Sequence, residues 1–212
     1  MAAAGQIFEN PLTGERMVFV KTARDSNGLL LEIEFFLQPN SGKGLPAHFH
    51  PSFDERFEIL AGSAHYIVGN DEHPANADDV ILLPRGIPHI HPWNVGNDVL
   101  HVRKITRLDR PDKDLLFKSE AFFETLYALA QEGKVGTDGL PKNLLQKVVV
   151  GQALEPASYS ATPPLWIQRP LFGLMAAIGR AFGYSGYCPA QYVIAGRVTP
   201  SVPSESEAKD ER

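Results

Sequence analysis

Residues 42–62 read GKGLPAHFHPSFDERFEILAG, and the prediction of the fold starts from them. His48 and His50 lie two positions apart, so on a β-strand both imidazoles point to the same face. Glu55 follows five residues later, which leaves room for a bend that returns its carboxylate to the imidazoles. This spacing predicts nitrogen and oxygen donors gathered on one side of a sheet.

A second stretch, PRGIPHIHPWN at residues 84–94, supplies a third imidazole. His89 follows a Pro/Gly turn and precedes a predicted strand, so a neighbouring hairpin can carry it to the first two histidines. Three imidazoles and a carboxylate can occupy one side of a divalent metal and leave positions open for water or substrate. Such donors suit Fe(II), Mn(II), Ni(II), Co(II) or Zn(II), and donor type alone does not rank these metals.

Both stretches resemble the sequence motifs of the cupin superfamily. The first motif, G(X)5HXH(X)4E(X)6G, is matched at Gly42, His48, His50, Glu55 and Gly62. The second, G(X)5PXG(X)2H(X)3N, is matched at Pro84, Gly86 and His89, but Asp78 replaces its first Gly and its Asn comes one residue late, at Asn94.

The resemblance implies a small, single-domain, mainly β cupin: a double-stranded β-helix (jelly-roll) barrel over residues 1–110. It also implies one divalent metal ion in the mouth of the barrel, held by His48, His50, Glu55 and His89. The segments ENPLTGERMVFVKTA, ETLYALAQEGK and PPLWIQRPLFGLMAAIGRAFGY further resemble cupins that carry a C-terminal helical extension.

Strand-like runs separated by polar turns fill the first half of the chain, which independently favours a sandwich or barrel. These runs are residues 16–20, 29–37, 57–60, 65–68, 80–83 and 99–105.

After Pro111 the pattern becomes helical and predicts an extension over residues 111–195. Ser119 is a candidate cap for a first helix that ends near Gly133, and Pro141 is a candidate start for a second.

A third helix is expected from about Thr162, with Pro170 kinking or restarting it. Its segment 171–178 is apolar on all faces, which favours burial against the barrel or a second subunit, with a membrane interface as the alternative. Residues 196–212 are polar and charged and predict a disordered tail.

Strand alternation predicts the walls of the cavity beside the metal site. Phe57 and Ile59 share the parity of Glu55, and with Tyr66 and Trp93 they would form a mostly apolar cavity suited to a small organic substrate. Tyr66 is a candidate hydrogen-bond donor to a metal-bound oxygen, with core packing as the alternative.

His91 lies two residues past His89, and alternation points it into the same cavity. It is a candidate general base, partner of a ligand or spare ligand, and packing against Trp93 is the alternative. Glu55 is a second candidate for proton transfer if it leaves the metal.

Composition excludes several classes of protein. The chain has 20 basic and 25 acidic residues and a net charge of −5, which argues against nucleic-acid binding. Its one cysteine, Cys188, can form neither an internal disulfide nor a Cys-rich zinc site. No secretory signal or 18-residue apolar run is seen, so a cytoplasmic location is expected.

Two functional hypotheses follow. The first is a metal-dependent cupin enzyme of oxygenase, isomerase, decarboxylase or cyclase type, acting on a small, fairly apolar molecule. The second is a non-catalytic ligand-binding cupin whose extension docks a partner or a membrane surface. A homodimer is expected in either case, because apolar helices and strand edges both favour being covered.

Overall fold

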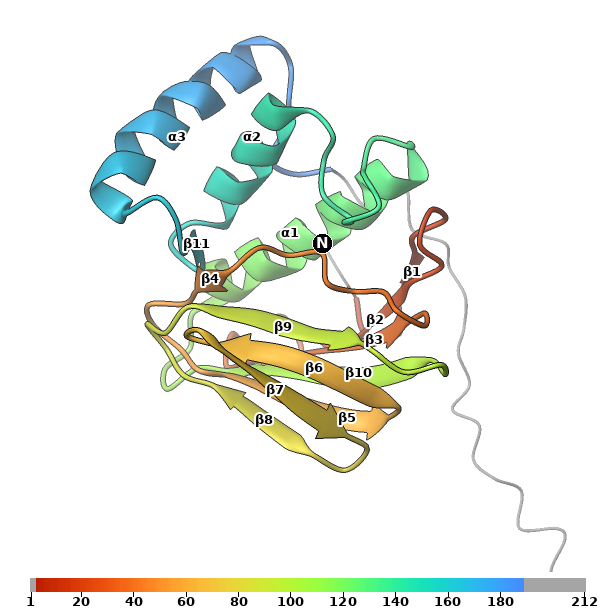
Figure 1. Cartoon of the computed structure of the whole chain (residues 1–212). Helices are drawn as coiled ribbons and strands as arrows, with labels where there is room; N and C mark the ends of the chain where they lie inside the picture. The colour runs from red at the N-terminus through yellow and green to blue at the C-terminus, as the bar shows by residue number, and fades with distance from the viewer. Residues whose placement is uncertain (1–2, 189–212) are drawn as a thin grey trace, which may run out of the picture.

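The computed structural model describes residues 3–188, so the predicted tail at 196–212 lies outside the described residues. Within that range the chain forms two antiparallel sheets and three helices (Figure 1). In strand order, one sheet contains β1 (Ile7–Glu9), β2 (Arg16–Lys21), β3 (Leu30–Leu37), β10 (Leu100–Arg107), β5 (Glu55–Ala61) and β8 (Val80–Leu83). The other contains β11 (Tyr159–Ser160), β4 (His48–Phe49), β9 (His89–Asn94), β6 (Ser63–Val68) and β7 (Asp71–Asn76).

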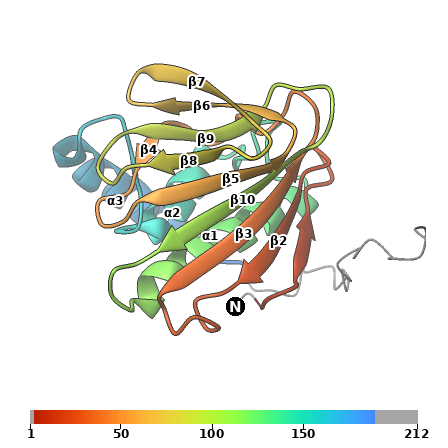
Figure 2. The same ribbon diagram turned by 90° about the horizontal axis from the view of Figure 1, so that it is seen from below.

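The two sheets enclose an apolar core, which confirms the predicted mainly β architecture with a helical extension (Figure 2). Strand alternation produces this core: in β3, Leu31, Ile33 and Phe35 are buried, while the residues between them are partly exposed. The same alternation in β5 buries Glu55 beside Phe57, as the sequence predicted.

Strand β7 was not predicted, because it has no apolar alternation and contains Pro74. It lies at the edge of the five-stranded sheet, where a proline need not donate to a neighbour.

The two departures from the second motif have local explanations. Asp78 adopts φ of 73°, the left-handed conformation that a Gly at this position would take without strain. Asn94 is buried and its side-chain nitrogen donates to the carbonyls of Leu37 and Asp98, so it joins the end of β9 to its surroundings.

Helix α1 (Lys113–Gln131) begins seven residues earlier than expected, so the prediction that Ser119 caps it is wrong. Asp112 is the cap: its carboxylate accepts the backbone N–H of Leu115 at 2.9 Å. Ser119 is buried inside the helix. The predicted end is close to the observed one, with Gly133 at φ of 69° just past it.

Helix α2 (Leu144–Leu154) starts at the Asn143 cap rather than at Pro141, because the Asn143 side chain accepts the N–H of Gln146. Helix α3 (Leu165–Ala181) continues through Pro170 without restarting. It packs on α2 through Gly179, where a Cβ atom would come within 2.6 Å of Val149 Cγ2.

The outer face of α3 is exposed rather than buried against the barrel. Leu174, between Arg169 and Arg180, is 63% exposed, and Phe182, just past the end of the helix, is 74% exposed. No helix within residues 3–188 combines the length and the hydropathy needed to cross a membrane.

The helical segment is joined to the strands at several points. β11 pairs with β4, and Phe123 of α1 packs on Phe35 of β3 with ring centroids 5.4 Å apart. Figure 1 shows all three helices on one side of the strands, with α1 nearest to them. The division of the chain at residue 110 stays a prediction.

Candidate metal centre

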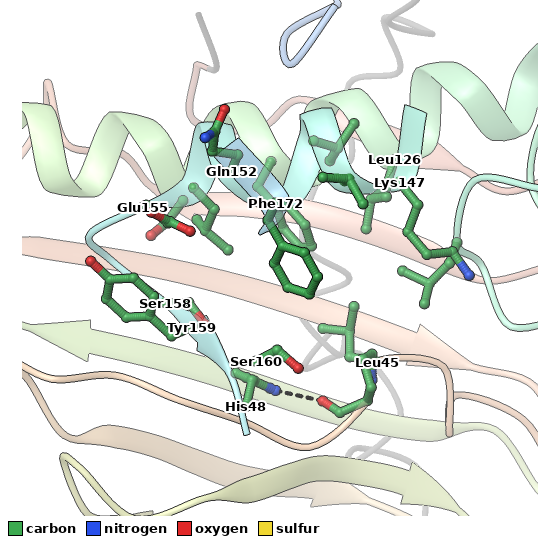
Figure 3. A pocket seen from close by; sticks show the side chains of 18 of the residues that line it. Leu45, His48, Leu126, Lys147, Gln152, Glu155, Ser158, Tyr159, Ser160 and Phe172 are labelled. Atoms are coloured by element: carbon green, nitrogen blue, oxygen red, sulfur yellow. Dashed lines mark hydrogen bonds between the residues drawn. The ribbon is translucent and has the colours of Figure 1, made fainter. Parts of the chain in front are cut away.

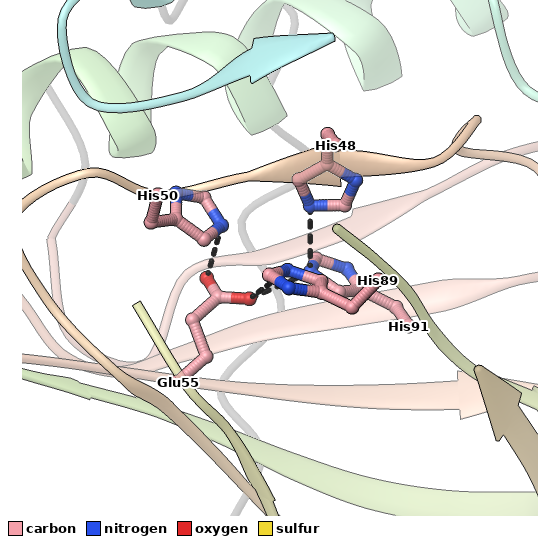
Figure 4. Close-up of side chains that lie close together, drawn as sticks. All are labelled: His48, His50, Glu55, His89 and His91. Atoms are coloured by element: carbon pink, nitrogen blue, oxygen red, sulfur yellow. Dashed lines mark hydrogen bonds and ion pairs between the residues drawn. The ribbon is translucent and has the colours of Figure 1, made fainter. Parts of the chain in front are cut away.

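Five potential ligands converge between the second sheet and β5 (Figure 4). Their ligand atoms all lie within 4.8 Å of one another, although they come from separate strands. They are His48 on β4, His50 just after it, Glu55 at the start of β5, and His89 and His91 on β9. The structure therefore brings together the four ligands implied by the resemblance and adds His91.

Backbone carbonyls orient three of the imidazoles. A carbonyl can only accept, so each of these rings donates Nδ1–H and turns the lone pair of Nε2 toward the cluster. The pairs are His48 with Pro46 O at 2.9 Å, His50 with Ala157 O at 2.7 Å, and His89 with Ile87 O at 2.9 Å. Such partners commonly orient metal-binding histidines.

Two buried ring nitrogens in the cluster make no hydrogen bond. They are Nε2 of His50 and Nε2 of His89. The two Nε2 atoms lie 3.2 and 3.6 Å from the Glu55 carboxylate, so lone pairs face one another across a short gap. A buried gap of this kind favours a cation, and imidazole with carboxylate suits a divalent transition metal.

His91 faces the cluster as alternation predicted. Its Nε2 lies 2.7 Å from Glu55 Oε2 and 3.1 Å from His48 Nε2. Burial lowers the His91 pKa to about 4, despite the opposing effect of Glu55. The alternative of packing against Trp93 is not what the structure shows, because Trp93 packs near His65 and His91 packs near Phe57.

Lys104 of β10 is a part of this centre that the sequence analysis missed. It is buried, and its Nζ contacts Glu55 Oε1 and donates to Thr106 Oγ1 at 2.9 Å. A signal was present, because Lys104 occupies an inward-facing position between the buried Val102 and Thr106.

Burial and charge act in opposite directions on Glu55. Burial alone would raise the pKa of its carboxyl, but the facing His50 and Lys104 outweigh this and hold the pKa well below its usual range. For His48, burial first and then the neighbouring His91 hold the pKa well below its ordinary value. Glu55 is therefore an anion surrounded by donors.

A cavity of about 440 Å³ opens on the cluster (Figure 3). The prediction for its walls was wrong for Phe57, Ile59, Tyr66 and Trp93, none of which lines it. The helical extension covers the mouth of the barrel and supplies the apolar walls instead, among them Phe122, Leu126, Val148, Leu154, Phe172 and Met175. The floor is polar and consists of His48, His50, Glu55, His91 and Lys104.

Two of these four residues, Phe57 and Tyr66, have other surroundings in the structure. Phe57 lines a second cavity of about 280 Å³, which also reaches His91. The Tyr66 ring packs 5.2 Å from that of His73 and against the apolar core, so the structure does not bring its hydroxyl into the cluster.

Residues 35–105 match the family model described as a cupin domain. No curated protein matches the chain.

Among solved structures, the chain is similar to a predicted oxalate decarboxylase from Thermotoga maritima, with 23% identity and a TM-score of 0.41. That match covers 44% of this chain and 80% of the other. KdgF from Halomonas sp. is 14% identical with a TM-score of 0.39, over 50% of this chain and 87% of the other. The DMSP lyase DddQ from Ruegeria pomeroyi is 25% identical with a TM-score of 0.31, over 39% and 40%.

Proposed function

We propose that this chain, whose residues 35–105 match the family model of a cupin domain, is a metal-dependent enzyme acting on a small, fairly apolar organic substrate. One observation carries the proposal: four imidazoles and a carboxylate converge in one cluster, and all of them except His89 line the floor of a mostly apolar cavity. Apolar walls with a few convergent polar groups are typical of small-molecule sites.

His48, His50, Glu55 and His89 are the proposed ligands of one divalent metal ion: Fe, Mn, Ni, Co or Zn. The buried Nε2 atoms of His50 and His89, which make no hydrogen bond, and the adjacent Glu55 carboxylate fit such an ion. Bound there, the metal supplies Lewis-acid polarisation of a substrate oxygen and, if it is redox-active, electron transfer.

The remaining groups have roles that follow from their positions. His91 lines the cavity and touches Glu55, which makes it the first candidate for moving a substrate proton. Glu55 is the second candidate, and Lys104 holds its carboxylate in place. The apolar helical walls exclude water from the reacting groups.

Tyr66 stays a weaker catalytic candidate, because its packing against His73 requires a rearrangement before its hydroxyl can reach a substrate. The reaction type is proposed only as a group: oxygenase, isomerase, decarboxylase or cyclase. An oxidoreductase is one of these outcomes and requires a redox-active metal.

The test is metal analysis of protein purified anaerobically without an affinity tag, beside a His48→Ala/His89→Ala double variant. We expect one divalent metal per chain in the wild type and loss of that metal in a folded double variant. Equal metal content in the two proteins would refute the site. So would a folded wild type that binds none of the five metals when each is supplied.

A second candidate function is a non-catalytic ligand-binding cupin whose extension docks a partner or a membrane surface. The exposed apolar face of α3, with Leu174 and Phe182, favours it. Measuring ligand affinity after the metal is removed distinguishes the two functions. Full retention of affinity supports the binding module, and loss of affinity supports the enzyme.

We also propose a homodimer, since β8 is a sheet edge with Val80 and Leu82 more than half exposed. A light-scattering mass of a single chain at micromolar concentration would contradict the dimer. A cytoplasmic location and the lack of nucleic-acid binding stay predictions, tested by cell fractionation and by DNA and RNA titration.

A further inference from the structure

The cavity above the cluster has two chemically different ends. One end is the polar and charged floor around the cluster. The other consists mostly of apolar side chains from the three helices, with Lys147, Gln152 and Glu155 among them (Figure 3). We propose that the substrate is amphipathic, with an anionic, oxygen-bearing head at the cluster and Lys104 and a hydrocarbon chain between α1, α2 and α3. This rests on the proposed function, because the metal would hold the head.

The helical walls carry the argument for the hydrocarbon chain. Phe122 and Leu126 of α1, Val148 of α2, and Phe172 and Met175 of α3 line one continuous space of about 440 Å³. Figure 3 shows the Phe172 ring projecting from α3 into this space on the side of His48. A chain of several methylenes gains free energy when it enters such a space.

The charges at the floor carry the argument for an anionic head. Glu55 and Lys104 contact each other and compensate in charge, so a divalent ion held by the imidazoles leaves the floor with a net positive charge. The other charged groups around the cavity are Lys147 and Glu155, which are also opposite in sign. A carboxylate or enolate is the head group that this balance favours.

The same walls disfavour a polyhydroxylated substrate. Hydroxyls facing Leu126, Val148 and Phe172 would lose water without gaining partners, which costs binding free energy.

The probe is a set of simple carboxylates, butanoate, hexanoate and octanoate, titrated by calorimetry into the Zn(II)-loaded protein, with octan-1-ol for comparison. We expect affinity to rise about three- to fourfold per methylene. Octan-1-ol should bind at least about tenfold more weakly than octanoate, because it lacks the anionic head. An affinity independent of chain length would overturn the proposal, as would equal binding of octan-1-ol and octanoate.

Val148→Phe reduces the space at the apolar end without touching the cluster. It should weaken the binding of octanoate more than that of butanoate, so that affinity rises less steeply with chain length. Partial unfolding would not produce this change. The control is Leu174→Ser on the exposed face of α3, which should leave the series unchanged. If Leu174→Ser flattens the series and Val148→Phe does not, the chain binds outside the cavity and the proposal fails.

Metal uptake by the wild type, measured beside the carboxylate series, distinguishes this inference from the proposed function. Dependence on chain length in a folded wild type that takes up no metal would support the apolar chain site and refute the metal enzyme. Metal uptake by the wild type with no dependence on chain length would refute the inference and leave the proposed function standing.

Discussion

The imidazole of His50 donates its Nδ1–H to the backbone carbonyl of Ala157 at 2.7 Å, across 107 positions of sequence. Ala157 follows α2 and precedes β11, so the helical extension directly orients one of the proposed metal ligands. The extension therefore contributes both the cavity walls and part of the geometry of the metal centre.

This contact predicts that Ala157→Leu weakens metal binding. Ala157 is fully buried, so a larger side chain must displace its own backbone and the carbonyl that holds His50. Loss of such an orienting partner typically costs about 10- to 100-fold in metal affinity. Chelator competition on protein shown to be folded by circular dichroism measures the change. The control is Ala177→Leu on the exposed side of α3, and equal affinities in the two variants would contradict the prediction.

The contact between Lys104 and Glu55 predicts a metal-dependent effect on stability. Lys104→Met leaves the Glu55 carboxylate buried without its ammonium partner, which should cost roughly 3 kcal/mol in the metal-free protein. Added divalent metal restores a positive charge beside Glu55, so it should raise the Tm of the variant more than that of the wild type. Thermal unfolding with and without metal measures this.

Lys147→Met is the control for the loss of a lysine from the same cavity. Lys147 is partly exposed and lies 3.9 Å from Asp138, so its removal should cost less than about 1 kcal/mol and show no metal dependence. Equal losses in the two variants would contradict a special role for Lys104.

The parts of this centre that the sequence predicted are those with local signals. The spacing of His48 and His50 fixes their common face, and a short Pro/Gly turn places His89 beside them. Glu55 was predictable for the same reason, because its parity along β5 matches that of the buried Phe57.

The parts that were missed depend on packing over long sequence separations. Ala157 acts through a backbone carbonyl, and the identity of its side chain gives no signal for that contact. The apolar helices were predicted, but not that they cover the mouth of the barrel, since periodicity shows which face is apolar and not what it packs against. β7 was missed because its edge position removes the need for an apolar face.

Glu120 of α1 predicts a pH dependence of stability outside the metal centre. Its carboxylate accepts the N–H of Ala23 at 2.5 Å, and burial raises its pKa from 4.5 to about 7, with a further contribution from Glu124. The folded state therefore holds the proton more tightly than the unfolded state. The contribution of protonated Glu120 to the free energy of unfolding is fully present below pH 4.5 and is lost as the pH rises through about 7.

Glu120→Gln keeps an oxygen that can accept from Ala23 and removes the titration. The free energy of unfolding of the variant relative to the wild type should rise by up to about 3 kcal/mol between pH 4.5 and pH 8. Urea unfolding at a series of pH values measures this, with Glu9→Gln as the control for loss of a surface carboxylate. A difference that stays flat across this range would show that Glu120 does not titrate in this way.

Substitution by alanine should change the free energy of unfolding in opposite directions at two helix glycines, Gly179 and Gly151. At Gly179 in α3, a Cβ would lie 2.6 Å from Val149 Cγ2 and 3.3 Å from the carbonyl oxygen of Leu145, so α2 and α3 must separate. We expect Gly179→Ala to lower the free energy of unfolding by about 1–3 kcal/mol. At Gly151 in α2 no atom lies within 4 Å of the added Cβ, so Gly151→Ala should raise it by up to about 1 kcal/mol through helix propensity. Urea unfolding of both variants measures the pair, and a destabilised Gly151→Ala beside an unchanged Gly179→Ala would contradict the close packing of these helices.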